Sequence, residues 1–146
     1  MNWSDKNHIV IVEDSEDDAK LAMKSFKELK SIKEIVWLKD GEEALHYFKG
    51  KGAYEKRDLS VKPKLIFLDL KLPKISGVDV LAELKIDSTY DEVPIVVVTS
   101  SGENRDLERC YELGANSYVV KPIDYSEFRN LTATVSQYWT MINQIP

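Results

Sequence analysis

The feature that most constrains the fold is a short, wholly apolar run that ends directly in a carboxylate. Residues 65–68 read Leu-Ile-Phe-Leu, Asp69 follows at once, and Pro73 ends the extended segment soon after. Such a run is typical of a strand buried on both faces in a parallel sheet covered by helices. An aspartate at the carboxyl end of that strand lies where open α/β sheets bind ligands. On this stretch alone, Asp69 could equally cap a loop or the next helix.

Apolar runs alternate with stretches of helical periodicity along the whole chain, and this alternation predicts the fold class. Besides residues 64–68, we expect strands at His8–Val12, Glu34–Leu38, Val93–Thr99 and Ser117–Val120. We expect helices over about 17–30, 43–48, 104–113 and 125–143, and one that opens at Ser76 or Gly77. Strict alternation predicts an α/β fold, a flavodoxin-like, doubly wound, five-stranded parallel sheet of the (βα)5 type with strand order 2-1-3-4-5.

Composition narrows the class of protein. A chain of 146 residues is the length of one domain, so we expect a single domain over residues 1–146. A net charge of −5 argues against nucleic-acid binding, and no apolar run is long enough to span a membrane. The first residues do not resemble a signal peptide. One cysteine, Cys110, excludes an internal disulfide and, with two histidines, weighs against a zinc site, so we expect a cytoplasmic protein.

Two stretches depart from the plain alternation. Residues 50–64 form a long, lysine-rich connection, which we interpret as a solvated insertion rather than a binding patch. The last helix is longer than a short strand needs for cover, so its tail at about 138–146 is expected to project. Tyr138, Trp139 and Ile142 in that tail are candidates for a dimer or partner surface, although they could also pack on the protein's own core.

Polar side chains stand just past the carboxyl ends of four of the expected strands. The first strand ends in Glu13 and Asp14, the third in Asp69, the fourth in Thr99 and the fifth in Lys121. In the order 2-1-3-4-5 the first and third strands are neighbours, so the three carboxylates should converge. Hard oxygen ligands around a partly open site suit Mg²⁺. Each residue alone has a plainer explanation, as a helix cap, a strand-end residue or a surface charge, but the whole set in chain order favours a common site.

These residue types together indicate phosphoryl-transfer chemistry. Asp69 could attack a phosphorus atom as a carboxylate nucleophile and form an aspartyl phosphate. Positioning and electrostatic stabilisation dominate such a transfer. Lys121 would neutralise charge and donate to a phosphoryl oxygen, and the hydroxyl of Thr99 would donate likewise or move as a sensor.

At these positions the chain resembles the receiver domain of two-component response regulators. The likeness covers nearly the whole chain, and its motifs agree in spacing and order. The matching pieces are residues 9–14, residues 68–73 with Ser76-Gly77, residues 98–100, Gly114-Ala115 and residues 118–122.

The resemblance implies a role for each matching residue of the metal and phosphate site. Asp69 would be the phosphoacceptor. Asp14 would ligate Mg²⁺ directly together with Asp69, Glu13 would act mainly through water, and the backbone carbonyl of Lys71 would complete the site. Lys71 also occupies a position that varies among receivers and influences the rate of dephosphorylation. The sequence does not show whether Lys71 would speed or slow that reaction.

The resemblance also implies a conformational switch. Thr99 would contact the phosphoryl group, and Lys121 would pair with it. Tyr118 would rotate inward when Thr99 moves, although a half-buried edge-strand aromatic is the plainer alternative. The Lys121–Pro122 bond would be a cis peptide.

More narrowly, the chain is similar to the stand-alone regulators that serve bacterial phytochrome kinases, through the segment before the third strand and the ending from Tyr138 to Asn143. The implied partner is a histidine kinase, and the implied homodimer uses the fourth helix, fifth strand, fifth helix and tail.

The function would be a phosphorylation-dependent signalling switch with output by protein interaction or phosphorelay, and no enzyme activity beyond self-phosphorylation and autodephosphorylation. The alternatives are a receiver-like interaction domain that is not phosphorylated and an aspartyl-phosphate hydrolase. Lys71 disfavours the hydrolase because such enzymes commonly have a second aspartate there, and Glu13-Asp14 disfavours binding of a flavin phosphate.

Overall fold

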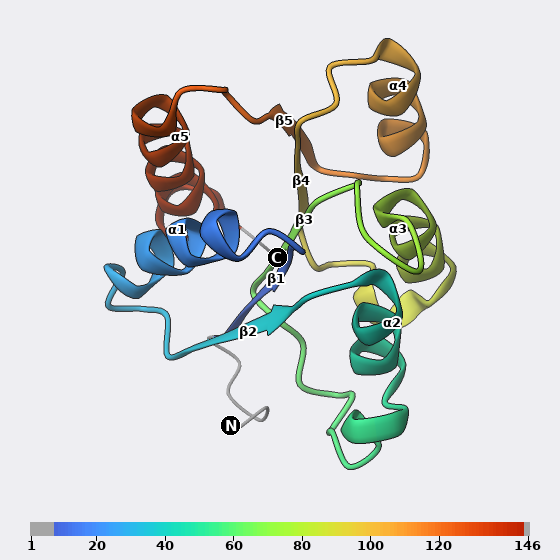
Figure 1. Cartoon of the computed structure of the whole chain (residues 1–146). Helices are drawn as coiled ribbons and strands as arrows, with labels where there is room; N and C mark the ends of the chain where they lie inside the picture. The colour runs from blue at the N-terminus through green and yellow to red at the C-terminus, as the bar shows by residue number, and fades with distance from the viewer. Residues whose placement is uncertain (1–7, 145–146) are drawn as a thin grey trace.

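The computed structural model describes residues 8–144, which form a parallel sheet between two layers of helices (Figure 1). Its five strands are β1 (His8–Val12), β2 (Glu34–Leu38), β3 (Leu65–Leu68), β4 (Ile95–Thr99) and β5 (Ser117–Val120), in the order β2-β1-β3-β4-β5. Every neighbouring pair is parallel. The predicted fold class and strand order are confirmed.

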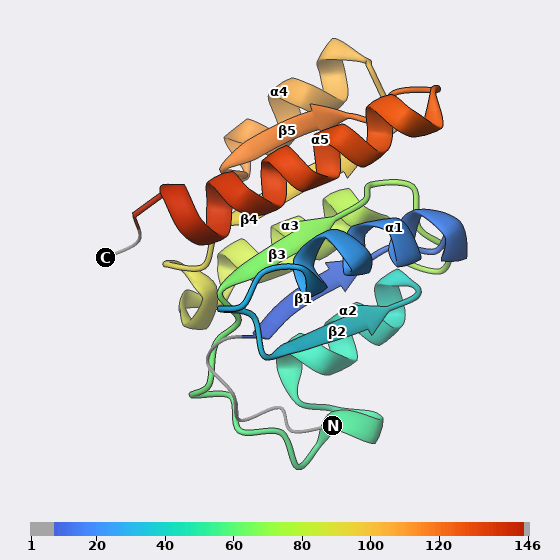
Figure 2. The same ribbon diagram turned by 90° about the vertical axis from the view of Figure 1, so that its left-hand side faces the viewer.

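Helices cover both faces of this sheet. Figure 2 shows α1 and α5 in front of the sheet, with α2, α3 and α4 behind it. Their bounds are α1 Glu16–Lys27, α2 Gly41–Lys49, α3 Gly77–Ile86, α4 Asn104–Glu112 and α5 Tyr125–Gln137, with short helical turns η1 Gly52–Tyr54, η2 Ser88–Tyr90 and η3 Tyr138–Ile142. Side chains of Ser15, Asp40, Ser76 and Asp124 accept a hydrogen bond from the first turn of α1, α2, α3 and α5 respectively, which fixes where these helices begin.

The sheet separates two apolar cores, and this explains why the central strands lack polar alternation. On β1, Ile9 and Ile11 pack with the α1 and α5 side, whereas Val10 and Val12 pack with the α2 and α3 side. All residues of β1 and β3 are buried. Apart from His8 at the start of β1, which bonds to the Tyr47 hydroxyl, polar side chains on these two strands come only past their carboxyl ends.

The segment between α2 and β3 is less solvated than its composition indicates. Lys51, Lys56 and Lys62 are exposed as expected, but Arg57 is buried. Its guanidinium lies 4.0 Å from the centre of the Tyr47 ring and donates to the hydroxyl of Tyr90 at 3.2 Å. The prediction of a solvated insertion is wrong at Arg57, because two aromatic rings from α2 and η2 provide it with a packing partner and an acceptor.

The end of the chain continues α5 as the π-helical turn η3. Trp139 packs against the core on the α1 and α5 side and Thr140 is buried, whereas Tyr138, Met141 and Ile142 are exposed. Residues 145–146 of the predicted projecting tail lie outside the described residues. Among residues 8–144, no helix combines the length and apolar character needed to cross a membrane.

One backbone prediction is wrong. No peptide bond of the described residues is cis, so Lys121–Pro122 is trans, which is the isomer that X–Pro bonds favour intrinsically.

Candidate functional site

The carboxyl ends of β1 and β3 bring three carboxylates together. The amide of Asp69 donates to the carbonyl of Val12 at 3.0 Å, which continues the pairing of the two strands one residue past their ends. Carboxylate oxygens of Glu13, Asp14 and Asp69 all lie within 4.8 Å of one another. Glu13 and Asp69 are buried, with exposed fractions of 4% and 6%, whereas Asp14 is exposed. Two buried carboxylates and one at the surface make a site that is open to a cation on one side.

Lys121 closes the other side of this cluster. From the end of β5, its ammonium donates to Glu13 Oε1 at 2.5 Å and to Asp69 Oδ2 at 3.0 Å. The lysine side chain is only 10% exposed. Burial alone would lower the pKa of Lys121, but the hydrogen bond and charge of Glu13 outweigh it and hold that pKa above its usual range. Lys121 therefore stays a cation in contact with the predicted phosphoacceptor.

Two further residues of the site escaped the sequence analysis. Asp18, in the first turn of α1, accepts a hydrogen bond from the Lys121 ammonium at 2.9 Å. Its place in an acidic first turn is already explained by helix capping, so the sequence carries no separate signal for this contact. Trp37, on the edge strand β2, donates from its indole nitrogen to the carbonyl of Glu13 at 2.8 Å. This bond fixes the backbone that presents Glu13 and Asp14.

Thr99 lies at the carboxyl end of β4 and Lys71 follows that of β3, and both flank the cluster. Thr99 ends β4 with no exposed surface, and its hydroxyl accepts from the amide of Ser101 at 3.3 Å. The amide of Lys71 donates to Asp69 Oδ1 at 3.3 Å, while its side chain is exposed. The Tyr118 ring packs partly buried against the core, and its hydroxyl donates to the carbonyl of Ser101 at 2.9 Å. Tyr118 thus binds the loop that follows Thr99.

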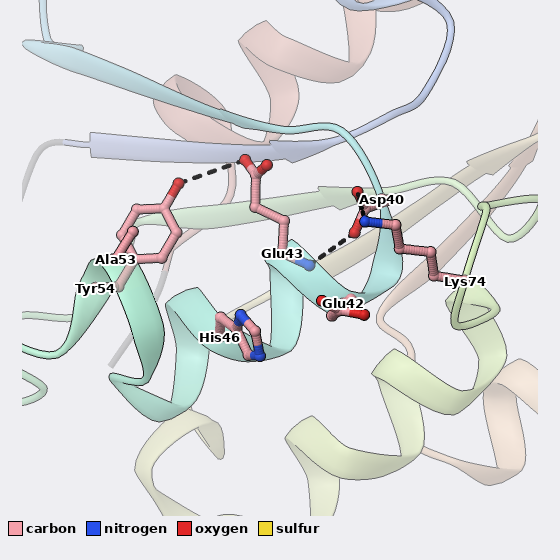
Figure 3. Close-up of a pocket in the computed structure, with 7 residues that line it drawn as sticks. All are labelled: Asp40, Glu42, Glu43, His46, Ala53, Tyr54 and Lys74. Carbon is pink, nitrogen blue, oxygen red and sulfur yellow. Dashed lines mark hydrogen bonds and ion pairs between the residues drawn. The ribbon is translucent and has the colours of Figure 1, made fainter.

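A pocket near α2 is separate from this cluster. Asp40, Glu43, Tyr54 and Lys74 are among the residues that line an open pocket (Figure 3). The volume of this pocket is about 260 Å³. Lys74, in the loop after β3, pairs with Asp40 at 3.5 Å. None of the residues that line this pocket belongs to the carboxylate cluster. The ion pair of Lys74 with Asp40 connects the loop that follows Asp69 to the start of α2.

Comparison with known families decides what this arrangement is. The model of the response regulator receiver domain matches residues 9–133. The chain belongs to the response regulator receiver family. Receivers are phosphorylation-dependent switches of two-component signalling rather than enzymes, and this chain is such a switch.

The relatives of this receiver include stand-alone regulators. The probable methanogenesis regulatory protein FilR2 of Methanothrix harundinacea is 35% identical over 138 residues, which cover 94% of this chain and 86% of FilR2. Response regulator Rcp1 of Synechocystis is 33% identical over 94% of this chain and 92% of its own length. The Mn²⁺-bound structure of Rcp1 has a TM-score of 0.87, covering 95% of this chain and 98% of that one. The phosphorylated cyanobacterial phytochrome regulator RcpA has a TM-score of 0.88 at 32% identity, with coverage of 95% and 97%.

The carboxylates of this receiver fit a divalent metal. Receivers bind such an ion, and the Rcp1 structure contains Mn²⁺. Burial raises the pKa of Glu13 from 4.5 to about 8, and the neighbouring Asp69 carboxylate adds to the rise, whereas Lys121 opposes it. Two crowded carboxylates with one ammonium are thus short of positive charge, which a divalent cation next to Asp14 would supply.

This pKa shift predicts a pH-dependent loss of stability in the metal-free receiver. Folded Glu13 holds its proton more tightly than the unfolded chain, so its stabilising contribution is complete below pH 4.5 and is lost as pH rises through about 8. The free energy of unfolding of the wild type, relative to Glu13→Gln, should fall across this window in a chelator. Urea denaturation at several pH values measures the difference. A difference that is flat or rises with pH contradicts the assignment to Glu13.

Proposed function

We propose that this receiver takes a phosphoryl group from a histidine kinase onto Asp69. Mg²⁺ would be the metal, held directly by Asp14, Asp69 and the Lys71 carbonyl, and by Glu13 mainly through water. The observation that carries the proposal is that the Asp69 carboxylate belongs to the acidic cluster and also accepts a hydrogen bond from the Lys121 ammonium. An oxygen of Asp69 forms the new O–P bond. The bond between phosphorus and the donor breaks, and its electron pair leaves with the donor imidazole, which takes up a proton.

The residues of the chain contribute positioning and charge to this step. When bound, Mg²⁺ would neutralise oxygens of the transferred group and of the carboxylates. Lys121, already at hydrogen-bond distance from Asp69 Oδ2, donates to a phosphoryl oxygen. The hydroxyl of Thr99 donates a hydrogen bond to another phosphoryl oxygen. Its contact with Ser101, and the bond from Tyr118 to the same loop, support coupling of the phosphate to β4, α4 and β5.

We further propose a cytoplasmic homodimer whose output is protein interaction or phosphorelay. Exposed apolar side chains on α4, β5 and η3 support a dimer surface, namely Tyr111, Val120, Tyr138, Met141 and Ile142. The likeness to RcpA supports a donor kinase of phytochrome type. FilR2, a probable methanogenesis regulatory protein, has a comparable identity, so a kinase of another type is the second candidate. The two candidates are compared by mixing each purified, phosphorylated kinase with this receiver and measuring how fast the kinase loses its phosphohistidine.

The test of phosphorylation uses a small-molecule acyl phosphate with and without Mg²⁺, read by intact mass. We expect one Mg²⁺-dependent phosphate adduct on the wild type and on Asp58→Asn, a matched change at an exposed loop aspartate, and none on Asp69→Asn. Size exclusion of the same samples reports whether phosphorylation drives dimerisation. A folded, metal-binding protein that forms no adduct would be an interaction domain. Release of free phosphate without an accumulated adduct would indicate a hydrolase.

A further inference from the structure

We propose that Asp18 competes with the phosphoryl group for the Lys121 ammonium and thereby favours the unphosphorylated state of the receiver. The inference rests on the proposed phosphorylation of Asp69 and concerns how strongly the resting site opposes the phosphorylated state. Asp18 acts through Lys121 and is therefore a positioning residue.

The donors of Lys121 are fully used in the resting site. An ammonium group has three N–H donors and no acceptor. Those of Lys121 reach Glu13 at 2.5 Å, Asp18 at 2.9 Å and Asp69 at 3.0 Å. A phosphoryl group on Asp69 brings new anionic oxygens, and each contact it gains from Lys121 must come from one of these three bonds.

Asp18 differs from the other two acceptors. Glu13 and Asp69 belong to the carboxylate cluster that fits a metal, whereas Asp18 does not. It comes from a helix rather than a strand end, and its side chain is 31% exposed against 6% and 7% for the other two. The backbone amide of Asp18 donates a hydrogen bond to the Ser15 hydroxyl at 3.3 Å, which fixes the backbone there. The Asp18 carboxylate can therefore exchange Lys121 for water without a change in the helix. Asp18 is thus the acceptor that Lys121 can release at the lowest desolvation cost.

Charge acts in the same direction as competition. Phosphorylation replaces the single negative charge of the Asp69 carboxylate with the larger charge of a phosphoryl group. The Asp18 carboxylate, which shares Lys121 with Asp69, repels that added charge and draws the ammonium toward α1. Both effects disfavour the phosphorylated state, so removing the charge of Asp18 should favour it.

Helix capping alone does not account for this contact. Asp17 lies in the same acidic first turn and would interact equally well with the helix dipole. Within the described residues, however, the carboxylates that pair with Lys121 are those of Glu13, Asp18 and Asp69. Asp17→Asn therefore removes the same charge from the same turn without touching Lys121, which makes it the matched control for Asp18→Asn.

The test measures binding of beryllofluoride, an unreactive stand-in for the phosphoryl group on an aspartate, by calorimetry at saturating Mg²⁺. Asp18→Asn should bind it about twofold to fivefold more tightly than the wild type, since a partly exposed ion pair contributes about that factor. Asp17→Asn should bind like the wild type. The gain from Asp18→Asn should vanish in a Lys121→Met background, because the competition acts through that ammonium. Asp18→Ser serves as a second variant, and thermal melts check that each protein is folded.

The outcomes separate this inference from the proposed function. Weaker or unchanged binding by Asp18→Asn would mean that Asp18 supports Lys121 rather than competing for it. An equal gain in Asp17→Asn, or a gain that persists without Lys121, would reduce the effect to general charge. Both results overturn the inference while leaving phosphorylation of Asp69 intact. A wild type that binds no beryllofluoride and forms no phosphate adduct overturns the proposed function and this inference with it.

Discussion

Replacing Lys121 with methionine should lower the free energy of unfolding of the metal-free receiver by about 3 kcal/mol near pH 7, because it leaves buried carboxylates without their cation. The ammonium lies within 3.0 Å of both Glu13 and Asp69, whose side chains are 6% and 7% exposed. Methionine is also unbranched and of similar volume, so the change removes charge and hydrogen bonds with little change in packing. The loss should shrink at low pH, where carboxylates gain protons in any case.

Urea denaturation in a chelator and in Mg²⁺ measures this effect. Lys71→Met is the matched control, since its side chain is exposed beside the same site, and it should change the free energy of unfolding by less than about 0.5 kcal/mol. Mg²⁺ should restore part of the loss in Lys121→Met, because a divalent cation replaces the missing positive charge. Equal effects of the two lysine variants, or a loss that Mg²⁺ does not reduce, would count against the role of Lys121 as the cation of the site.

The strand-end residues of this site were predictable because topology alone places them. In a parallel sheet all strands present their carboxyl ends at one edge, and the flavodoxin-like order 2-1-3-4-5 makes β1 and β3 neighbours. Glu13 and Asp69 were therefore expected to meet once that strand order was assigned. No side-chain conformation was needed for that step.

Residues that act from other elements were not predictable in this way. The contact of Asp18 with Lys121 depends on how α1 packs over the sheet and on the conformation of a long lysine side chain. Arg57 looked solvated because its partners, Tyr47 and Tyr90, lie 10 and 33 residues away in the chain. Burial of a charged side chain depends on such distant partners, which composition does not contain.

The close approach of Gly77 to the phosphoacceptor loop was also invisible in the sequence, and it leads to the second large expected effect. A Cβ atom at position 77 would lie 2.1 Å from the carbonyl oxygen of Asp69 and 2.5 Å from Cα of Leu70. These are backbone atoms, which cannot rotate away as a flexible side chain can. The amide of Gly77 also donates to the carbonyl of Leu70 at 2.8 Å, so the start of α3 is attached to this loop.

Gly77→Ala should therefore cost about 3 kcal/mol in the free energy of unfolding, despite the better helix propensity of alanine. The folded fraction should be phosphorylated by an acyl phosphate at least about tenfold more slowly, because moving the Asp69 backbone misplaces the attacking oxygen. Gly102→Ala is the control, since nothing lies within 4 Å of its added Cβ, and it should change neither quantity. Loss of stability with an unchanged rate would mean that α3 moves and the loop stays in place. Unchanged values of both would show that this contact imposes no constraint on Asp69.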